Sequence, residues 1–265
     1  MTLHLFDRVA VECEGEGEAV VCVHGLGGSS NTWTPLMSAL ARHRVVRIDL
    51  PGSGRSQRVE GPLSIARFVE VAVQACERLG IASAHWLGHS MGTIVCQHLA
   101  AQCPRLVRSL ALYGPLAEPT ESARAGLRAR AAQARGGAPG LHDIAQQLVR
   151  AALSADTREH QPVVAAYVRD GLMRSDGEAY ARSCEALAAA QAAPAQQIRA
   201  PVLLVTGDED AVSPPQAVRA LAERLSAARL VRSVVLPRCG HWTPIERPAE
   251  CAREWREFVA AVARP

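Results

Sequence analysis

Runs of consecutive apolar residues alternate along the chain with segments of helical periodicity. Residues 64–79 have the pattern of an amphipathic helix, with Ser64 suited to its N-cap and Gly80 to its end. Four apolar runs lack polar alternation, as expected for strands buried on both faces: Ala19–His24, Ala84–Gly88, Ser109–Tyr113 and Pro201–Gly207. This alternation predicts a mostly parallel sheet with helices on both faces.

The remaining pattern places a helical insertion in that sheet. Further strands are expected at Leu3–Asp7, Val9–Glu14, Val45–Asp49 and Leu230–Leu236, and helices at about Met91–Gln102 and Pro248–Val262. Between Pro115 and Pro194 there is no strand signal, and helical patterns flank a Gly-Gly-Ala-Pro-Gly stretch. We therefore expect residues 1–114 and 195–265 to form one core domain, and residues 115–194 to form a helical cap above one end of the sheet.

Composition excludes several other classes of protein. The chain has 265 residues, is 48% hydrophobic and 21% charged, and carries a net charge of +3, which is ordinary for a globular enzyme. No basic run is interleaved with aromatic residues, so a nucleic-acid partner is not expected. Neither a signal peptide at the first eight residues nor a bilayer-spanning apolar stretch is expected, so no membrane partner is either. The eight cysteines form no CxxC pair, which favours a reduced, cytoplasmic setting.

The candidate nucleophile is Ser90. It lies in Gly88-His89-Ser90-Met91-Gly92, a G-x-S-x-G pattern between a predicted strand and a predicted helix. That context is what the motif requires, because the serine must be exposed on a strained strand-to-helix turn and the glycines leave room for neighbouring elements. We expect His89 to point away from the Ser90 hydroxyl and to have a structural role.

A serine hydroxyl needs a neighbouring base, and the base is in turn oriented by an acid. His241 follows the last predicted strand, and a loop at the carboxyl end of a strand is where an open α/β sheet places functional groups. The acid should follow the strand that ends at Thr206, where Asp208, Glu209 and Asp210 are available. We favour Asp210, because the acid must reach back over its loop towards the histidine, and keep Asp208 as the alternative.

The glycine-rich turn after the first long buried strand is the candidate oxyanion hole. His24-Gly25-Leu26-Gly27-Gly28 lets backbone amides approach a developing negative charge, and we expect the donors to be the amides of Leu26 and Met91. The turn lacks the spacing and the terminal lysine of a phosphate-binding loop. No cofactor is expected, and no metal-ligand spacing is present.

Together these segments resemble the α/β-hydrolase superfamily over essentially the whole chain. That resemblance implies the α/β-hydrolase fold, with a mostly parallel eight-stranded sheet, flanking helices and a helical cap. It also places the acid three residues after Gly207, which supports Asp210, and gives Asp49–Ser56 a structural role. The matching segments are His24–Ser30, Asp49–Ser56, Gly88–Gly92, Gly207–Asp210 and Gly240–Trp242.

Within the superfamily, the chain is most similar to the 3-oxoadipate enol-lactonase group and its esterase relatives. The similarity lies in Ser175–Leu187 of the cap, Gly25–Ser29 and Trp33. The chain departs from that group at Ala189-Ala190-Gln191, where the lactonases have an acidic residue. This departure affects the choice of substrate and leaves the proposed triad unchanged.

These residues predict a serine hydrolase acting on a small-molecule carboxylic ester or lactone. Gly25, Trp33 and Trp242 are expected to shape the substrate pocket, although the tryptophans could equally belong to the core. The cap arginines could supply a group for a substrate carboxylate, although at helical spacing they also fit a solvated face. Three alternatives remain: a hydrolase of carbon–carbon bonds, a cofactor-free haloperoxidase-like esterase, and a ligand receptor. The sequence leaves the oligomeric state open.

Overall fold

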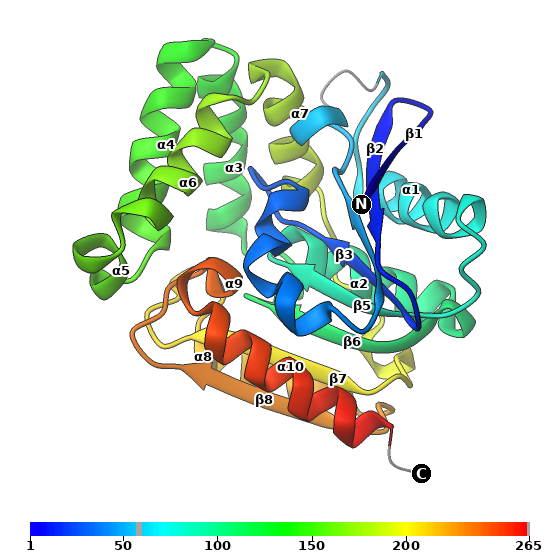
Figure 1. The fold of residues 1–265 in the computed structure, drawn as a ribbon. Helices are drawn as coiled ribbons and strands as arrows, with labels where there is room; N and C mark the ends of the chain where they lie inside the picture. Colours follow the sequence, from blue (N-terminus) through cyan, green and yellow to red (C-terminus); the bar gives the residue numbers. More distant parts are fainter. Residues whose placement is uncertain (57–59, 264–265) are drawn as a thin grey trace.

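The strands of the protein form one mostly parallel sheet (Figure 1). The computed structural model describes residues 1–56 and 60–263, so residues 57–59 and 264–265 of the expected core lie outside it. The sheet has eight strands in the order β1-β2-β4-β3-β5-β6-β7-β8. Each neighbouring pair within β4-β3-β5-β6-β7-β8 is parallel. Their bounds are Thr2–Phe6, Val9–Glu14, Ala19–Val23, Arg44–Ile48, Ala84–His89, Val107–Tyr113, Val202–Gly207 and Val231–Leu236 for β1 to β8. The predicted fold class is confirmed.

The first two strands form an antiparallel hairpin at one edge of the sheet. Asp7 and Arg8 join them, and both have positive φ angles, of 48° and 69°. Two consecutive positive φ angles suit the right-handed twist of a two-residue hairpin. The expected first strand, Leu3–Asp7, is therefore displaced by one residue, because Asp7 belongs to the turn.

Helices cover both faces of the sheet. On one face, α1 (Ile65–Arg78), α2 (Met91–Gln102) and α8 (Pro215–Arg224) pack against alternate strand residues such as Val21 and Val23. On the other, the 3₁₀ segment η1 (Ser30–Leu40) and the last helix α10 (Pro248–Val262) pack against the intervening residues, such as Val20 and Cys22. As expected, the Ser64 hydroxyl caps α1 by accepting from the Arg67 amide at 3.1 Å.

The segment between β6 and β7 is helical, and sits beyond one end of the sheet in Figure 1. In it, α3 packs against α7 and α4 against α6. Its apolar interior extends to Trp242 and Leu26, so that this segment, called the cap below, shares one cluster with residues outside it. The helices are α3 (Glu121–Ala134), α4 (Ala138–Ala152), α5 (Ala155–His160), α6 (Pro162–Met173) and α7 (Gly177–Ala188).

Candidate active site

Ser90 lies on a sharp turn between β5 and α2. Its φ of 51° and ψ of −119° are unusual for a residue with a side chain, and its amide donates to the Tyr113 carbonyl of β6 at 2.9 Å. Gly92 permits this turn, because a Cβ there would lie 2.2 Å from the Val23 carbonyl oxygen. Such backbone strain persists only where the surrounding structure over-determines it.

A continuous hydrogen-bond chain links Ser90 to His241 and Asp210. His241 Nε2 lies 2.8 Å from Ser90 Oγ, and His241 Nδ1 lies 2.9 Å from Asp210 Oδ2. An ionised carboxylate can only accept, so the Nδ1 hydrogen is donated to Asp210 and Nε2 is left to accept from the serine hydroxyl. The three predicted residues are thereby brought together in the arrangement that activates a serine.

Of the three acidic candidates after β7, only Asp210 contacts His241. It is 2% exposed, and its Oδ1 accepts from the amides of Val212 and Ser213 at 2.8 and 2.7 Å. Burial alone would raise the pKa of Asp210, but the neighbouring imidazole and these amides outweigh it and hold that pKa below its ordinary value. Asp208 and Glu209 are exposed and accept instead from the amides of Cys239 and Ala155.

Gly114, the residue after β6, provides the space that the His241 ring occupies. It has a φ of 55°, and a Cβ there would lie 2.9 Å from both Cε1 and Nδ1 of the imidazole. Gly114 was not predicted from the sequence to be part of the site. Its only signal was a glycine directly after a buried strand, at the edge of the sheet where the site was expected.

The expected oxyanion-hole residues flank the nucleophile. Met91 is the first residue of α2, and Leu26 follows Gly25 in the turn after β3. Within the described ranges, neither the Leu26 nor the Met91 amide donates to another protein group, as the expected role of both requires. Gly25 keeps this space clear, because a Cβ there would lie 2.7 Å from the Cβ of Ser90.

Two buried histidines brace the loops around the site. The Leu50 amide donates to His24 Nε2 at 3.0 Å, while His24 Nδ1 donates to the Gly25 carbonyl at 2.7 Å, so this ring joins two loops. His89 Nε2 donates to the His241 carbonyl at 2.9 Å. Burial first, and the neighbouring His241 second, lower the pKa of His89 to about 3, so this ring stays neutral.

The two tryptophans expected in the substrate pocket lie in different places. Trp33 is fully buried in the cluster between the sheet and η1, with its ring centroid 5.8 Å from that of Tyr113 in an edge-to-face arrangement, which favours the core over the pocket for this residue. It shares one face of η1 with Leu36 and Leu40, and this face packs into the core. Trp242 packs beside His89, with ring centroids 5.1 Å apart, in the cluster shared with the cap.

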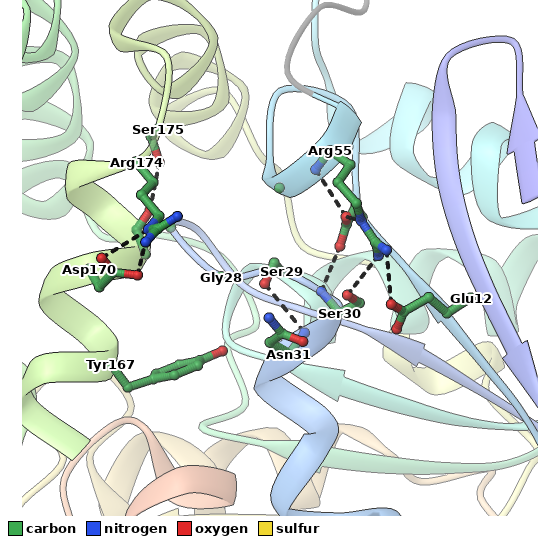
Figure 2. A pocket seen from close by; sticks show the side chains of 14 residues that line it. Glu12, Gly28, Ser29, Ser30, Asn31, Arg55, Tyr167, Asp170, Arg174 and Ser175 are labelled. Carbon is green, nitrogen blue, oxygen red and sulfur yellow. Dashed lines mark hydrogen bonds and ion pairs between the residues drawn. The ribbon is translucent and has the colours of Figure 1, made fainter. Parts of the chain in front are cut away.

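A cavity of about 660 Å³ lies between the turn after β3 and α6 (Figure 2). Tyr167 and Arg174 border it from the cap side, and Arg55 from the core side. Arg55 is held by Asp49 at 2.7 Å and Glu12 at 2.9 Å, so its charge is neutralised within the wall. Ser90 and His241 do not line this cavity, which lies beside the site rather than over the nucleophile.

Two cap arginines that were candidates for binding a carboxylate have protein partners. Arg124 is buried and donates to the Ala188 carbonyl at 2.6 Å, and Arg135 bridges two glutamates of α7 on the surface. Within residues 1–56 and 60–263, no group of three metal-ligating side chains is placed to hold an ion. No helix in the same ranges is long and apolar enough to cross a bilayer.

Comparison with known proteins finds a family model and hydrolases that match this chain. The family model for the alpha/beta hydrolase fold matches residues 18–248. The 2-hydroxymuconate semialdehyde hydrolase of Pseudomonas putida is 29% identical over 96% of this chain and 91% of its own. In two other curated relatives the match is local and covers 48% and 38% of the relative's length.

Two solved structures are similar over nearly the whole chain. The enol-lactonase from Burkholderia xenovorans LB400 superimposes with a TM-score of 0.87, at 29% identity, over 98% of this chain and 100% of its own. A thermophilic esterase from Thermogutta terrifontis superimposes with a TM-score of 0.88, at 26% identity, over 97% and 94%.

Proposed function

Because this chain belongs to the α/β-hydrolase family, we propose that it is a serine hydrolase that cleaves a carboxylic ester or lactone. The observation that carries this proposal is the hydrogen-bond chain from Ser90 through His241 to Asp210. The strained turn that carries Ser90, and the Leu26 and Met91 amides without a protein acceptor beside it, support the same chemistry.

The acylation step follows from the orientation of His241. Its Nε2 takes the proton from Ser90 Oγ as the oxygen attacks the substrate carbonyl, and Asp210 stabilises the imidazolium that forms without taking the proton itself. The oxygen of the tetrahedral intermediate is held by the amides of Leu26 and Met91. One such donor typically contributes about 3 kcal/mol of transition-state stabilisation.

The same groups complete the turnover. His241 returns the proton to the departing alkoxide, which leaves an acyl group on Ser90. A water molecule then loses its proton to His241 and attacks the acyl carbonyl, and the acid product leaves as Ser90 recovers its hydrogen. Only the substrate and one water molecule are consumed, and the protein returns to its starting state.

The surroundings of the site favour a substrate with an apolar group. Leu26 and Trp242 share an apolar cluster with Ile144, Leu172 and Tyr180 of the cap, so apolar side chains join the cap to the loops beside the proposed site. The likeness to an enol-lactonase and to an esterase supports the ester or lactone class. The full-length likeness to 2-hydroxymuconate semialdehyde hydrolase supports one alternative, cleavage of a carbon–carbon bond by the same triad.

The test is hydrolysis of three substrates by the purified protein: p-nitrophenyl esters of increasing chain length, 3-oxoadipate enol-lactone and a ring-cleavage dienoate. We expect turnover of the esters or the lactone, and a loss of about 10⁴-fold or more in Ser90→Ala. A fluorophosphonate probe should label the protein at Ser90.

The matched control is Ser183→Ala. It removes another buried hydroxyl, which donates to the Ala179 carbonyl of the same cap helix, and should keep the wild-type rate. Full activity in Ser90→Ala would overturn the proposal. Preference for the dienoate would select the carbon–carbon alternative, and inactivity on all three substrates with no labelling of Ser90 would favour a ligand receptor.

A further inference from the structure

Three consecutive amides around His241 each donate to a buried acceptor. The Gly240 and Trp242 amides donate to the two oxygens of the Glu246 carboxylate, both at 3.1 Å. The His241 amide donates to the carbonyl of Ala152, the last residue of α4, at 2.8 Å. The backbone that carries the base is therefore held partly by the cap.

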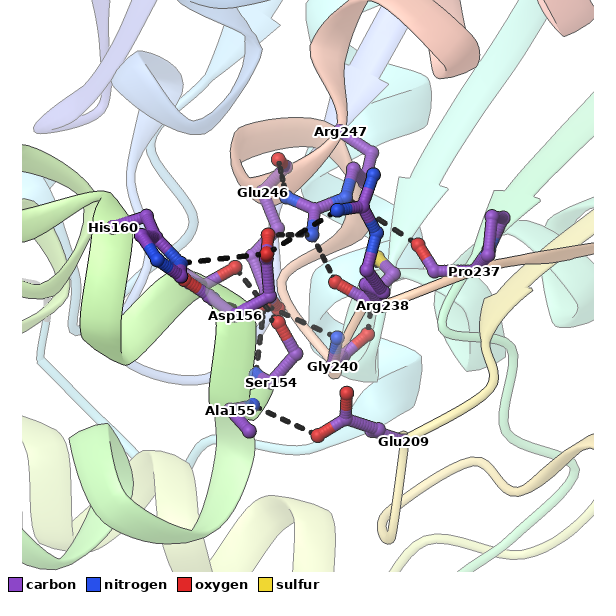
Figure 3. Close-up of polar contacts among 12 residues, drawn as sticks. Ser154, Ala155, Asp156, His160, Glu209, Pro237, Arg238, Gly240, Glu246 and Arg247 are labelled. Atoms are coloured by element: carbon purple, nitrogen blue, oxygen red, sulfur yellow. Dashed lines mark hydrogen bonds and ion pairs between the residues drawn. The ribbon is translucent and has the colours of Figure 1, made fainter.

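Glu246, at the end of the short helix α9 (Thr243–Glu246), also bonds to the cap directly (Figure 3). Its Oε2 accepts from the Ser154 amide at 2.9 Å, and the residue is only 1% exposed. A buried carboxylate is costly unless hydrogen bonds replace its water, and three amides do so here. The carboxylate thus joins both neighbours of His241 to the α4–α5 junction of the cap.

The contact between the α4–α5 junction and the His241 loop, called the seam below, leaves no room for a side chain at residue 240. A Cβ on Gly240 would lie 2.5 Å from the Ala152 carbonyl oxygen and 2.8 Å from Glu246 Oε1. Glycine is therefore required beside the base for contact with the cap. This contact was invisible in the sequence, because Ser154 and Glu246 are 92 residues apart.

Adjacent contacts fasten the same cap segment to the core, as Figure 3 shows. The Ala155 amide donates to Glu209 Oε2 at 2.8 Å, and Glu209 precedes the acid Asp210. Asp156 pairs with Arg247 at 2.6 Å. The α4–α5 junction therefore contacts the loops that supply both the base and the acid.

We propose that Glu246 and the cap segment 152–154 are positioning groups for His241, so that the docked cap sets the base as well as covering the substrate. The imidazole direction depends on the backbone of residues 240–242, and an error of about 1 Å in such a group can reduce turnover about 10²-fold. The inference rests on the proposed function for its effect on turnover. The position of the His241 ring can be measured without any substrate.

The sharpest test compares Ser154→Pro with Ser154→Ala. Ser154 has a φ of −62° and the preceding Leu153 has φ −102° and ψ 146°, so the backbone already suits proline. Both variants lose the hydroxyl that caps α5. Only proline also removes the amide hydrogen and displaces the Glu246 carboxylate, so the difference between the variants isolates that bond.

We expect kcat for p-nitrophenyl acetate to be at least tenfold lower in Ser154→Pro than in Ser154→Ala, with KM within about threefold. The downfield proton resonance of His241 Nδ1–H, bonded to Asp210, should broaden by exchange with water in Ser154→Pro only. Glu246→Gln should behave like Ser154→Pro, because its amide group turns a donor towards amides that are themselves donors.

Equal kcat and equal resonances in the two Ser154 variants would overturn the positioning role, as would a change confined to KM. If Ser90→Ala proved fully active, the proposed function would fail. The His241 resonance would still report whether the cap holds the ring.

Discussion

Replacing Gly114 by alanine tests whether the His241 ring is confined as tightly as the structure indicates. A new Cβ would lie 2.9 Å from Cε1 and Nδ1 of the imidazole, where carbon contacts ordinarily exceed about 3.4 Å. The ring must therefore move by roughly 0.5 Å or more. Its bonds to Ser90 and Asp210, at 2.8 and 2.9 Å, cannot both survive that shift with good geometry.

The substitution has a second effect, which a control can remove. Gly114 has a φ of 55°, and an alanine in the left-handed region costs about 1–2 kcal/mol. Gly80, which follows α1, has a φ of 67°, and a Cβ there would have nothing within 4 Å. Gly80→Ala therefore carries the same backbone strain without a contact at the site.

The assay is kcat for p-nitrophenyl acetate together with the free energy of unfolding in urea. Both variants should lose about 1–2 kcal/mol of stability from the strained backbone. Only Gly114→Ala should also lose activity, by about 10- to 100-fold in kcat. If the two variants have kcat values within threefold of each other, the ring is not confined by Gly114 and the reasoning is refuted.

Much of the framework could be predicted because it depends on local pattern. The strands β3, β5 and β7 are buried along their whole length, and each was visible as a mostly apolar run without polar alternation. Ser64 and Gly80, predicted to begin and end a helix, do so through a side-chain cap and a positive φ, both properties of single residues. The G-x-S-x-G pattern around Ser90, between a predicted strand and a predicted helix, likewise indicates the sharp turn on which that serine lies.

The parts that could not be predicted depend on contacts between distant segments. The 3₁₀ segment η1 was not expected, since Pro35 lies inside it and its pattern is not that of an α-helix. Trp33 faces the core because η1 turns that side towards the sheet, and the sequence does not define this rotation. The seam between Glu246 and Ser154 arises only when the cap folds back onto the loop that carries His241.

Two further predictions concern charge. Asp210→Asn should reduce kcat by about 10³- to 10⁴-fold, because the wrong imidazole tautomer is then favoured, whereas Asp208→Asn should stay within fivefold of wild type; comparable losses would contradict the assignment of the acid. Burial lowers the pKa of His85 to about 4, and that of His89 to about 3, against about 6.5 in the unfolded chain. Between these values the unfolded chain binds protons that the folded protein does not, so the free energy of unfolding should fall as the pH falls, by about 2 kcal/mol for each histidine from pH 7 to pH 5. Urea unfolding at both pH values measures this loss, and His85→Asn should remove its own share; an undiminished loss in that variant would show that His85 is not held neutral by burial.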